Sequence, residues 1–252
     1  MLPEGEDSDV DNDAYLASIR LEGGRLAAAA RLGPTAHVPS CPDWDMFQLL
    51  AHVEAVHCWV AEVLRTKATS RPDWAERGPG TPFGELADAY DAGLAELVGL
   101  FAATDPSESV WNWSTGVAPA AFWWRRMAQE TAVHRWDAEA AVGPPVPIEP
   151  LLAVDGIDEF LGIVAQSVSR HPIGGLAGSL ALVAADEGVS WHLELAPGRL
   201  DRRDPFAAAA TVTAGASDLY LWLLHRIATG AGSVAASGEA ASLAAWDLVT
   251  FD

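Results

Sequence analysis

Residues 126–139 read RMAQETAVHRWDAE, and this stretch decides how the chain is expected to fold and where its chemistry lies. Its helical periodicity and helix-forming composition predict one helix. Glu130 and His134 are four residues apart, which places them on one face of that helix, within about 40° of each other. A carboxylate and an imidazole arranged this way can bind a single metal ion.

A third candidate ligand lies on an earlier predicted helix, within the sequence LAHVE at residues 50–54. His52 has apolar flanks there, so it is expected to face the interior. Two histidines and one glutamate are a ligand set of catalytic zinc, which keeps a fourth position for water or substrate. A Glu/His pair at this spacing is also common as a surface ion pair, and spacing alone leaves that alternative open.

Four stretches of helical periodicity predict a four-helix bundle around these residues. The expected helices cover residues 14–31, 45–67, 83–103 and 119–142, with polar connections that contain glycine and proline. Asp43 or Asp45 is expected to cap the second helix.

The segment 144–150, PPVPIEP, separates two predicted domains because its prolines fix backbone angles and remove amide donors. Residues 14–143 form the expected metal-binding bundle, and residues 151–252 mix helices and strands, as in a small α+β domain. The elements expected there are a helix over 151–169, a hairpin of strands 179–185 and 189–195, a strand over 209–213, a helix over 219–226 capped by Ser217 and Asp218, a short strand near Val234 and a last helix over 240–248.

Composition restricts the possible partners. The formal net charge of −20 argues against nucleic acid and anionic membranes, since both repel a negative surface. No 18-residue apolar run indicates a membrane span, and the acidic start lacks the pattern of a signal peptide. Residues 1–13 contain six acidic residues and predict a disordered tail. Two cysteines make no disulfide framework, so we expect a reduced, cytoplasmic, monomeric protein.

Other reactive residues receive structural interpretations. His57 points about 140° away from His52 and is placed at the edge of the bundle. Cys41 precedes a proline and a helix, but no His-Asp pair supports it as a nucleophile. His37, His171 and His192 lie in loops or strands without partners. The tryptophans near the predicted ligands are expected to pack in the core and to keep the site dry; they are Trp44, Trp59, Trp123, Trp124 and Trp136.

Two stretches of the sequence resemble motifs of a known family. VPSCPDW at residues 38–44, followed by LLAHV at 49–53, looks like the first motif of the mycothiol-dependent maleylpyruvate isomerases, and residues 126–139 look like the second. That family is related to the DinB-like superfamily of metal-binding bundles. The C-terminal half resembles the domain appended in this family, which is similar to sterol carrier proteins.

The resemblance implies that His52, Glu130 and His134 bind zinc or another divalent metal and that mycothiol is a cofactor or co-substrate. The thiol of mycothiol would enter the open position as a thiolate. The implied reaction is a cis/trans isomerisation by thiolate addition to a conjugated double bond, rotation and elimination. Release of the adduct would instead make the protein a mycothiol S-transferase, and a non-catalytic metal- or ligand-binding protein is the alternative from another class.

A small anionic or electrophilic substrate would need positive charge in so acidic a protein. Arg226, at the end of the helix over 219–226, is the leading candidate for a catalytic contact with a substrate carboxylate, and compensation of the helix dipole is its alternative role. Further candidates are Arg126, Arg135, Arg202 and Arg203.

Overall fold

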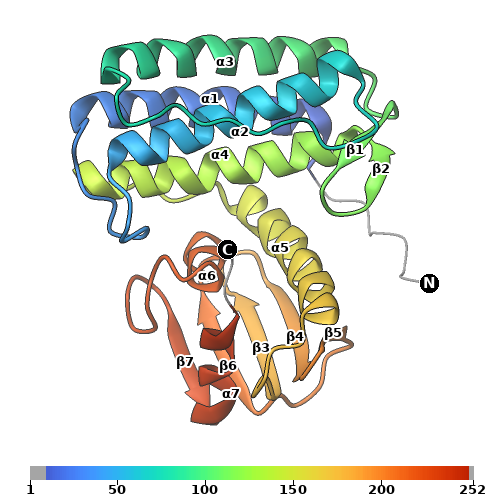
Figure 1. The fold of residues 1–252 in the computed structure, drawn as a ribbon. Coiled ribbons are helices and arrows are strands. Elements are labelled where there is room, and N and C mark those ends of the chain that lie inside the picture. The colour runs from blue at the N-terminus through green and yellow to red at the C-terminus, as the bar shows by residue number, and fades with distance from the viewer. Residues whose placement is uncertain (1–9, 250–252) are drawn as a thin grey trace. The chain divides into compact units, whose positions relative to one another are not determined.

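The computed structural model describes residues 10–249, and the chain divides into two compact units between Val146 and Pro147. The first unit contains four long helices and a small hairpin, and the second contains a five-stranded sheet with helices (Figure 1). The predicted fold class, helices followed by an α+β domain, is confirmed. Of the acidic tail predicted over residues 1–13, residues 1–9 lie outside the described part, while residues 12 and 13 are helical.

The helices of the first unit lie side by side (Figure 1). Side-chain caps mark the start of the first two. Asp11 caps the first helix by accepting from the amide of Ala14, and Asp45 forms a capping box with Gln48 at the second. Of the two expected caps, Asp45 is therefore the one used. The four helices are α1 (Asn12–Leu32), α2 (Met46–Thr66), α3 (Phe83–Ala103) and α4 (Ala121–Val142).

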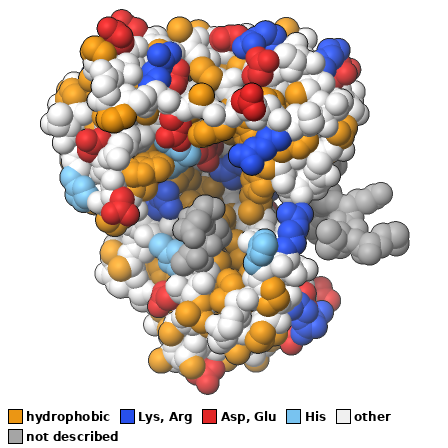
Figure 2. All heavy atoms as spheres, viewed as in Figure 1, with side chains coloured by type: hydrophobic (Ala, Val, Ile, Leu, Met, Phe, Trp, Pro, Cys, Tyr) orange, Lys and Arg blue, Asp and Glu red, His pale blue; other side chains and the backbone are white. Residues whose placement is uncertain are grey.

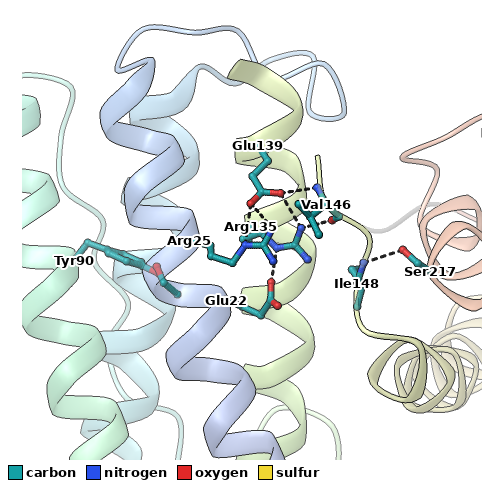
Figure 3. Close-up of polar contacts among 9 residues, drawn as sticks. Glu22, Arg25, Tyr90, Arg135, Glu139, Val146, Ile148 and Ser217 are labelled. Carbon is teal, nitrogen blue, oxygen red and sulfur yellow. Dashed lines mark hydrogen bonds and ion pairs between the residues drawn. The ribbon is translucent and has the colours of Figure 1, made fainter. Parts of the chain in front are cut away.

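Apolar side chains from α1, α2 and α3 form the core of this unit. Fully buried members include Leu26, Met46, Leu49, Leu50 and Leu86, and each such side chain contributes roughly 1.5–3 kcal/mol through its burial. At Gly23 the helices come close together: a Cβ there would lie 2.7 Å from Leu94 Cδ2, so a larger residue would displace the end of the Leu94 side chain. The hydroxyl of Tyr90 donates to the Gly23 carbonyl over 3.2 Å at the same crossing (Figure 3).

A buried ion-pair network ties α4 to α1 (Figure 3). Arg135 is fully buried; it pairs with Glu22 of α1, and its Nη1 lies 2.9 Å from Glu139 Oε2. Glu139 also pairs with Arg25 of α1 over 2.8 Å and accepts from the amide of Val146 over 2.8 Å. The network thereby joins α1, α4 and the segment after α4. Arg135 has a structural role here, in place of the substrate contact that the sequence allowed.

A hairpin that the periodicity did not predict lies between α3 and α4. Its strands, β1 (Ser109–Asn112) and β2 (Gly116–Pro119), are antiparallel. The side-chain oxygen of Asn112 closes the turn by accepting from the amides of Ser114 and Thr115 over 2.9 and 2.8 Å. Because this hairpin takes up the residues through 119, α4 begins two residues later than expected.

The second unit is built on a mixed sheet with the strand order β5-β4-β3-β6-β7. Strands β3 and β6 pair in parallel, and the other neighbours are antiparallel. The predicted hairpin is present as β3 and β4, whereas β5 was not predicted. The strands are β3 (Gly178–Ala184), β4 (Val189–Ala196), β5 (Arg199–Arg203), β6 (Ala210–Ala214) and β7 (Ala235–Gly238).

Helices accompany this sheet, and one of them ends earlier than expected. They are α5 (Pro150–Arg170), α6 (Ala216–Leu223), α7 (Ala240–Ala244) and the 3₁₀ turn η1 (Trp246–Leu248). Arg226 therefore lies beyond the end of α6. Ser217 was expected to cap α6, but it does not. Its hydroxyl oxygen instead accepts a hydrogen bond from the amide of Ile148 over 2.9 Å (Figure 3).

Charged side chains of both signs are interspersed over the face shown in Figure 2. Several basic residues there and elsewhere are held in exposed ion pairs, such as Arg31 with Asp91 and Arg65 with Glu96. None of the helices among residues 10–249 is both long and apolar enough to cross a membrane.

Candidate metal centre

Helices α2 and α4 bring His52, Glu130 and His134 together, and we call these three residues the metal triad. One ligand atom from each lies within 4.8 Å of the others. The Nε2 atoms of His52 and His134 lie 3.3 and 3.2 Å from Glu130 Oε1. Among residues 10–249, the metal triad is the one group of three or more His, Cys, Asp or Glu that has metal-site geometry.

The donor atoms of the metal triad fit a divalent ion such as zinc. Zinc is held by imidazole nitrogen and carboxylate oxygen at about 2.0–2.2 Å in tetrahedral geometry, which separates neighbouring ligand atoms by roughly 3.4 Å. The two histidine–glutamate distances, 3.3 and 3.2 Å, are close to this spacing. A three-residue set also keeps one coordination position open for a small molecule.

Charge coupling within the metal triad is strong. Burial opposes ionisation of Glu130, but His134, His52 and Arg126 outweigh it and hold the pKa of this carboxyl well below its usual range. Burial likewise opposes the charged form of His134, yet Glu130 and Asp137 together raise its pKa to about 9. A cation placed among these groups would replace a proton on His134 as the partner of the Glu130 carboxylate.

Asp137 is a site residue that the sequence reasoning missed. Its Oδ2 lies 3.0 Å from His134 Nδ1, and its Oδ1 accepts from the hydroxyl of Ser40 over 2.5 Å. Asp137 is fully buried. The available signal was the spacing His-x-x-Asp within residues 126–139, since positions three apart share a helix face.

Tryptophans flank the metal triad, and one of them comes from an irregular segment. The Trp44 ring lies 5.0 Å from the ring of His52 and 6.1 Å from that of His134. The ring of Trp74, a residue between α2 and α3, lies 6.2 Å from the His52 ring, and Trp74 is 38% exposed. The segment that carries Trp74 is attached to α2 where Trp59 Nε1 donates to the carbonyl of Pro72 over 3.1 Å.

His57 does not lie at the edge of the bundle, as was expected from its angle to His52. It is fully buried, its Nε2 lies 3.0 Å from the hydroxyl of Thr131, and its ring packs 5.6 Å from that of Tyr90. Burial lowers its pKa to about 4, so His57 is neutral at physiological pH. The expectation failed because α2 contacts both α3 and α4, which buries more than one stripe of its surface.

The arginines considered for substrate binding differ in their surroundings. Arg126 reaches the metal triad, with Nη2 3.3 Å from Glu130 Oε2. In the second unit, Arg202 pairs with Asp158 over 2.8 Å. Arg203 pairs with Glu194 over 2.9 Å. Arg226 donates from Nη1 to the carbonyl of Leu224 over 2.9 Å.

Comparison with known proteins is consistent with this geometry. The family model described as the mycothiol maleylpyruvate isomerase N-terminal domain matches residues 17–139, a span that includes the whole metal triad. A crystal structure of mycothiol-dependent maleylpyruvate isomerase is similar in fold, with a TM-score of 0.66 and 17% identity over 92% of this chain and 95% of that chain. A crystal structure of a mutant of that enzyme gives a TM-score of 0.66 and 15% identity over the same shares. No curated protein matches the sequence.

Proposed function

We propose that this protein is a metal-dependent enzyme that uses mycothiol to isomerise a small electrophilic substrate. The match of residues 17–139 to the mycothiol maleylpyruvate isomerase N-terminal domain model supports this proposal. The observation that carries the proposal is the convergence of His52, Glu130 and His134 within 4.8 Å. The similar solved structures are of an enzyme that depends on mycothiol, which supports this thiol as the cofactor.

The residues of the site have distinct tasks in this proposal. His52 and His134 would hold the ion through Nε2, and Glu130 would supply a negatively charged oxygen. When bound, zinc or a similar ion supplies a positive charge that stabilises a coordinated thiol as its thiolate. Trp44 and Trp74 provide apolar surface beside the metal triad, which excludes water and strengthens electrostatic interactions there.

Isomerisation follows from ordinary thiol chemistry. Addition of a thiolate to a conjugated cis double bond makes that bond single, rotation follows, and elimination regenerates the thiol and leaves the trans isomer. An S-transferase would use the same site and release the adduct. In the isomerase, a cation that binds the substrate carboxylate would keep the adduct in place until elimination, and Arg226 remains our candidate for this role.

The direct test is to incubate the zinc-loaded protein with mycothiol and maleylpyruvate and to follow both the trans isomer and any thioether adduct by mass spectrometry. Catalytic formation of the trans isomer, dependent on both metal and thiol, supports an isomerase. Accumulation of a stoichiometric or released adduct with maleylpyruvate or other electrophiles supports the S-transferase instead. If the protein binds zinc and yields neither product with any electrophile tested, the enzymatic proposal is wrong.

A further inference from the structure

Resting on the proposed metal binding, we propose that Asp137 is a positioning residue of the metal centre. It holds a proton on Nδ1 of His134 and thereby keeps Nε2 of that ring available as the ligand atom. Asp137 would act through His134 and would not touch the ion or the substrate.

The geometry separates the two nitrogens of His134 cleanly. Nε2 faces the other members of the metal triad and lies 3.2 Å from Glu130 Oε1. Nδ1 faces Asp137 instead and lies 3.0 Å from its Oδ2. Asp137 follows one turn later on α4 and is fully buried. The His134 side chain is also almost completely buried, so protein groups decide which nitrogen carries the proton.

The choice of tautomer follows from what a carboxylate can do. A neutral imidazole binds a metal through the nitrogen that has no proton, so the other nitrogen must carry it. An ionised carboxylate only accepts hydrogen bonds, and the nitrogen that faces Asp137 must therefore be the donor. With the proton on Nδ1, the Nε2 lone pair points at the metal triad.

Asp137 is itself held in position from outside its helix. Ser40 lies in the segment between α1 and α2, and its hydroxyl donates to Asp137 Oδ1 over 2.5 Å. Backbone hydrogen bonds fix this segment, including Val38 N to Trp44 O at 3.0 Å and Met46 N to Ala36 O at 2.9 Å. Ser40 therefore leaves Oδ2 aimed at His134 and limits rotation of the carboxylate.

The other histidine of the metal triad offers a matched comparison. Nδ1 of His52 also faces a carboxylate, that of Glu76, but at 3.6 Å, beyond hydrogen-bond distance. The Glu76 side chain is 46% exposed, so water competes for it. Neutralising Glu76 or Asp137 removes one negative charge near the site in either case. Only the change at Asp137 also removes a hydrogen bond to a metal-triad histidine.

The test compares Asp137→Asn, Ser40→Ala and Glu76→Gln with the wild type in zinc affinity, measured by competition with a chromophoric chelator. Asp137→Asn should weaken zinc binding by about 10–100-fold, the usual effect of losing such a partner. Ser40→Ala should have a smaller effect in the same direction, and Glu76→Gln should remain within about threefold of the wild type. Far-UV circular dichroism checks that each variant is folded.

A second measurement does not depend on any variant. Long-range ¹H–¹⁵N NMR of the zinc-loaded wild type should show the His134 proton on Nδ1 and zinc on Nε2. A wild type that takes up no zinc contradicts the proposed function. Wild-type zinc binding with an unchanged affinity in folded Asp137→Asn, or a His134 ring that carries its proton on Nε2, overturns the positioning role alone. If Asp137→Asn does not fold, the NMR result decides.

Discussion

His52 and His134 approach one carboxylate oxygen from two different helices: their Nε2 atoms lie 3.3 and 3.2 Å from Glu130 Oε1. Neither helix holds the complete ligand set, so the site exists only when α2 and α4 are packed together. Replacing one of these side chains should remove metal binding without unfolding the helices, because the core of the unit is built from apolar residues elsewhere on them.

Replacing His52 or His134 by Ala should lower zinc affinity by more than about 100-fold, beyond the usual effect of losing a partner outside the ligand set. The reason is that three protein ligands are the usual set of a catalytic zinc. Elemental analysis and chelator competition measure the loss, and far-UV circular dichroism should show that the helices are retained. A variant with full zinc content would mean that the metal triad is wrongly assigned.

Trp74→Ala should raise KM for the electrophilic substrate several-fold and leave zinc affinity unchanged, since Trp74 contacts the His52 ring but offers no metal ligand. Trp113→Ala, at a ring that is 42% exposed on the hairpin, is the matched control. Equal KM values for Trp74→Ala and the wild type would remove Trp74 from the substrate site.

Arg226→Ala should lower kcat/KM for an anionic electrophile by at least about 10-fold and leave zinc affinity unchanged, if its guanidinium binds a substrate carboxylate. Arg226→Lys should restore only part of the activity, because an ammonium group cannot make the bidentate contact. Arg65→Ala serves as the control, since Arg65 pairs with Glu96 at an exposed position. Activity of Arg226→Ala equal to that of the control would show that Arg226 does not bind the substrate.

His57 should make the first unit sensitive to acid. In the folded protein the pKa of His57 is about 4, below the ordinary value of 6.5. Between these two pH values His57 is therefore protonated in the unfolded chain and neutral in the folded one. The contribution is zero above pH 6.5 and becomes destabilising as pH falls toward 4, by roughly 3 kcal/mol. Urea unfolding at pH 7.5 and 4.5 should show a smaller pH dependence for His57→Gln than for the wild type or for His171→Gln, an exposed control.

Arg135→Met should destabilise the first unit by about 3–5 kcal/mol, because Glu22 would keep a buried charge without its partner, while Glu139 would still pair with Arg25. Urea unfolding measures this effect. Arg65→Met, which removes an exposed pair with Glu96, should cost no more than about 1 kcal/mol. Adding Glu22→Gln to Arg135→Met should recover part of the stability, and a double variant as unstable as the single one would count against the charge explanation.

The metal triad and the long helices could be predicted because their signals are local. Glu130 and His134 share a helix face by spacing, and proline or an acidic cap marks the helix ends; α3 begins and ends at the expected residues. The apolar flanks of His52 on an earlier helix suggested it as the third ligand, the family resemblance implied the same residue, and the structure places it beside the other two.

The missed features depend on packing between elements or on weak local patterns. Strand β5 has one apolar residue, Leu200, among charged ones, so its position in the sheet comes from pairing with β4. The hairpin of β1 and β2 is too short for a clear alternation. Ser40 and Asp137 meet only when the segment before α2 folds over α4, and no spacing along the chain reports that contact.

The division of the chain between Val146 and Pro147 also sets an order of events during synthesis. The metal triad, its Asp137 partner and the Arg135 network that fixes Val146 are all translated before the first strand of the sheet, which starts at Gly178. The sheet must wait longer, because β3 pairs with β6 and β6 pairs with β7 near the C-terminus. The helical unit can therefore fold, with the metal triad assembled, while the second unit is still being synthesised.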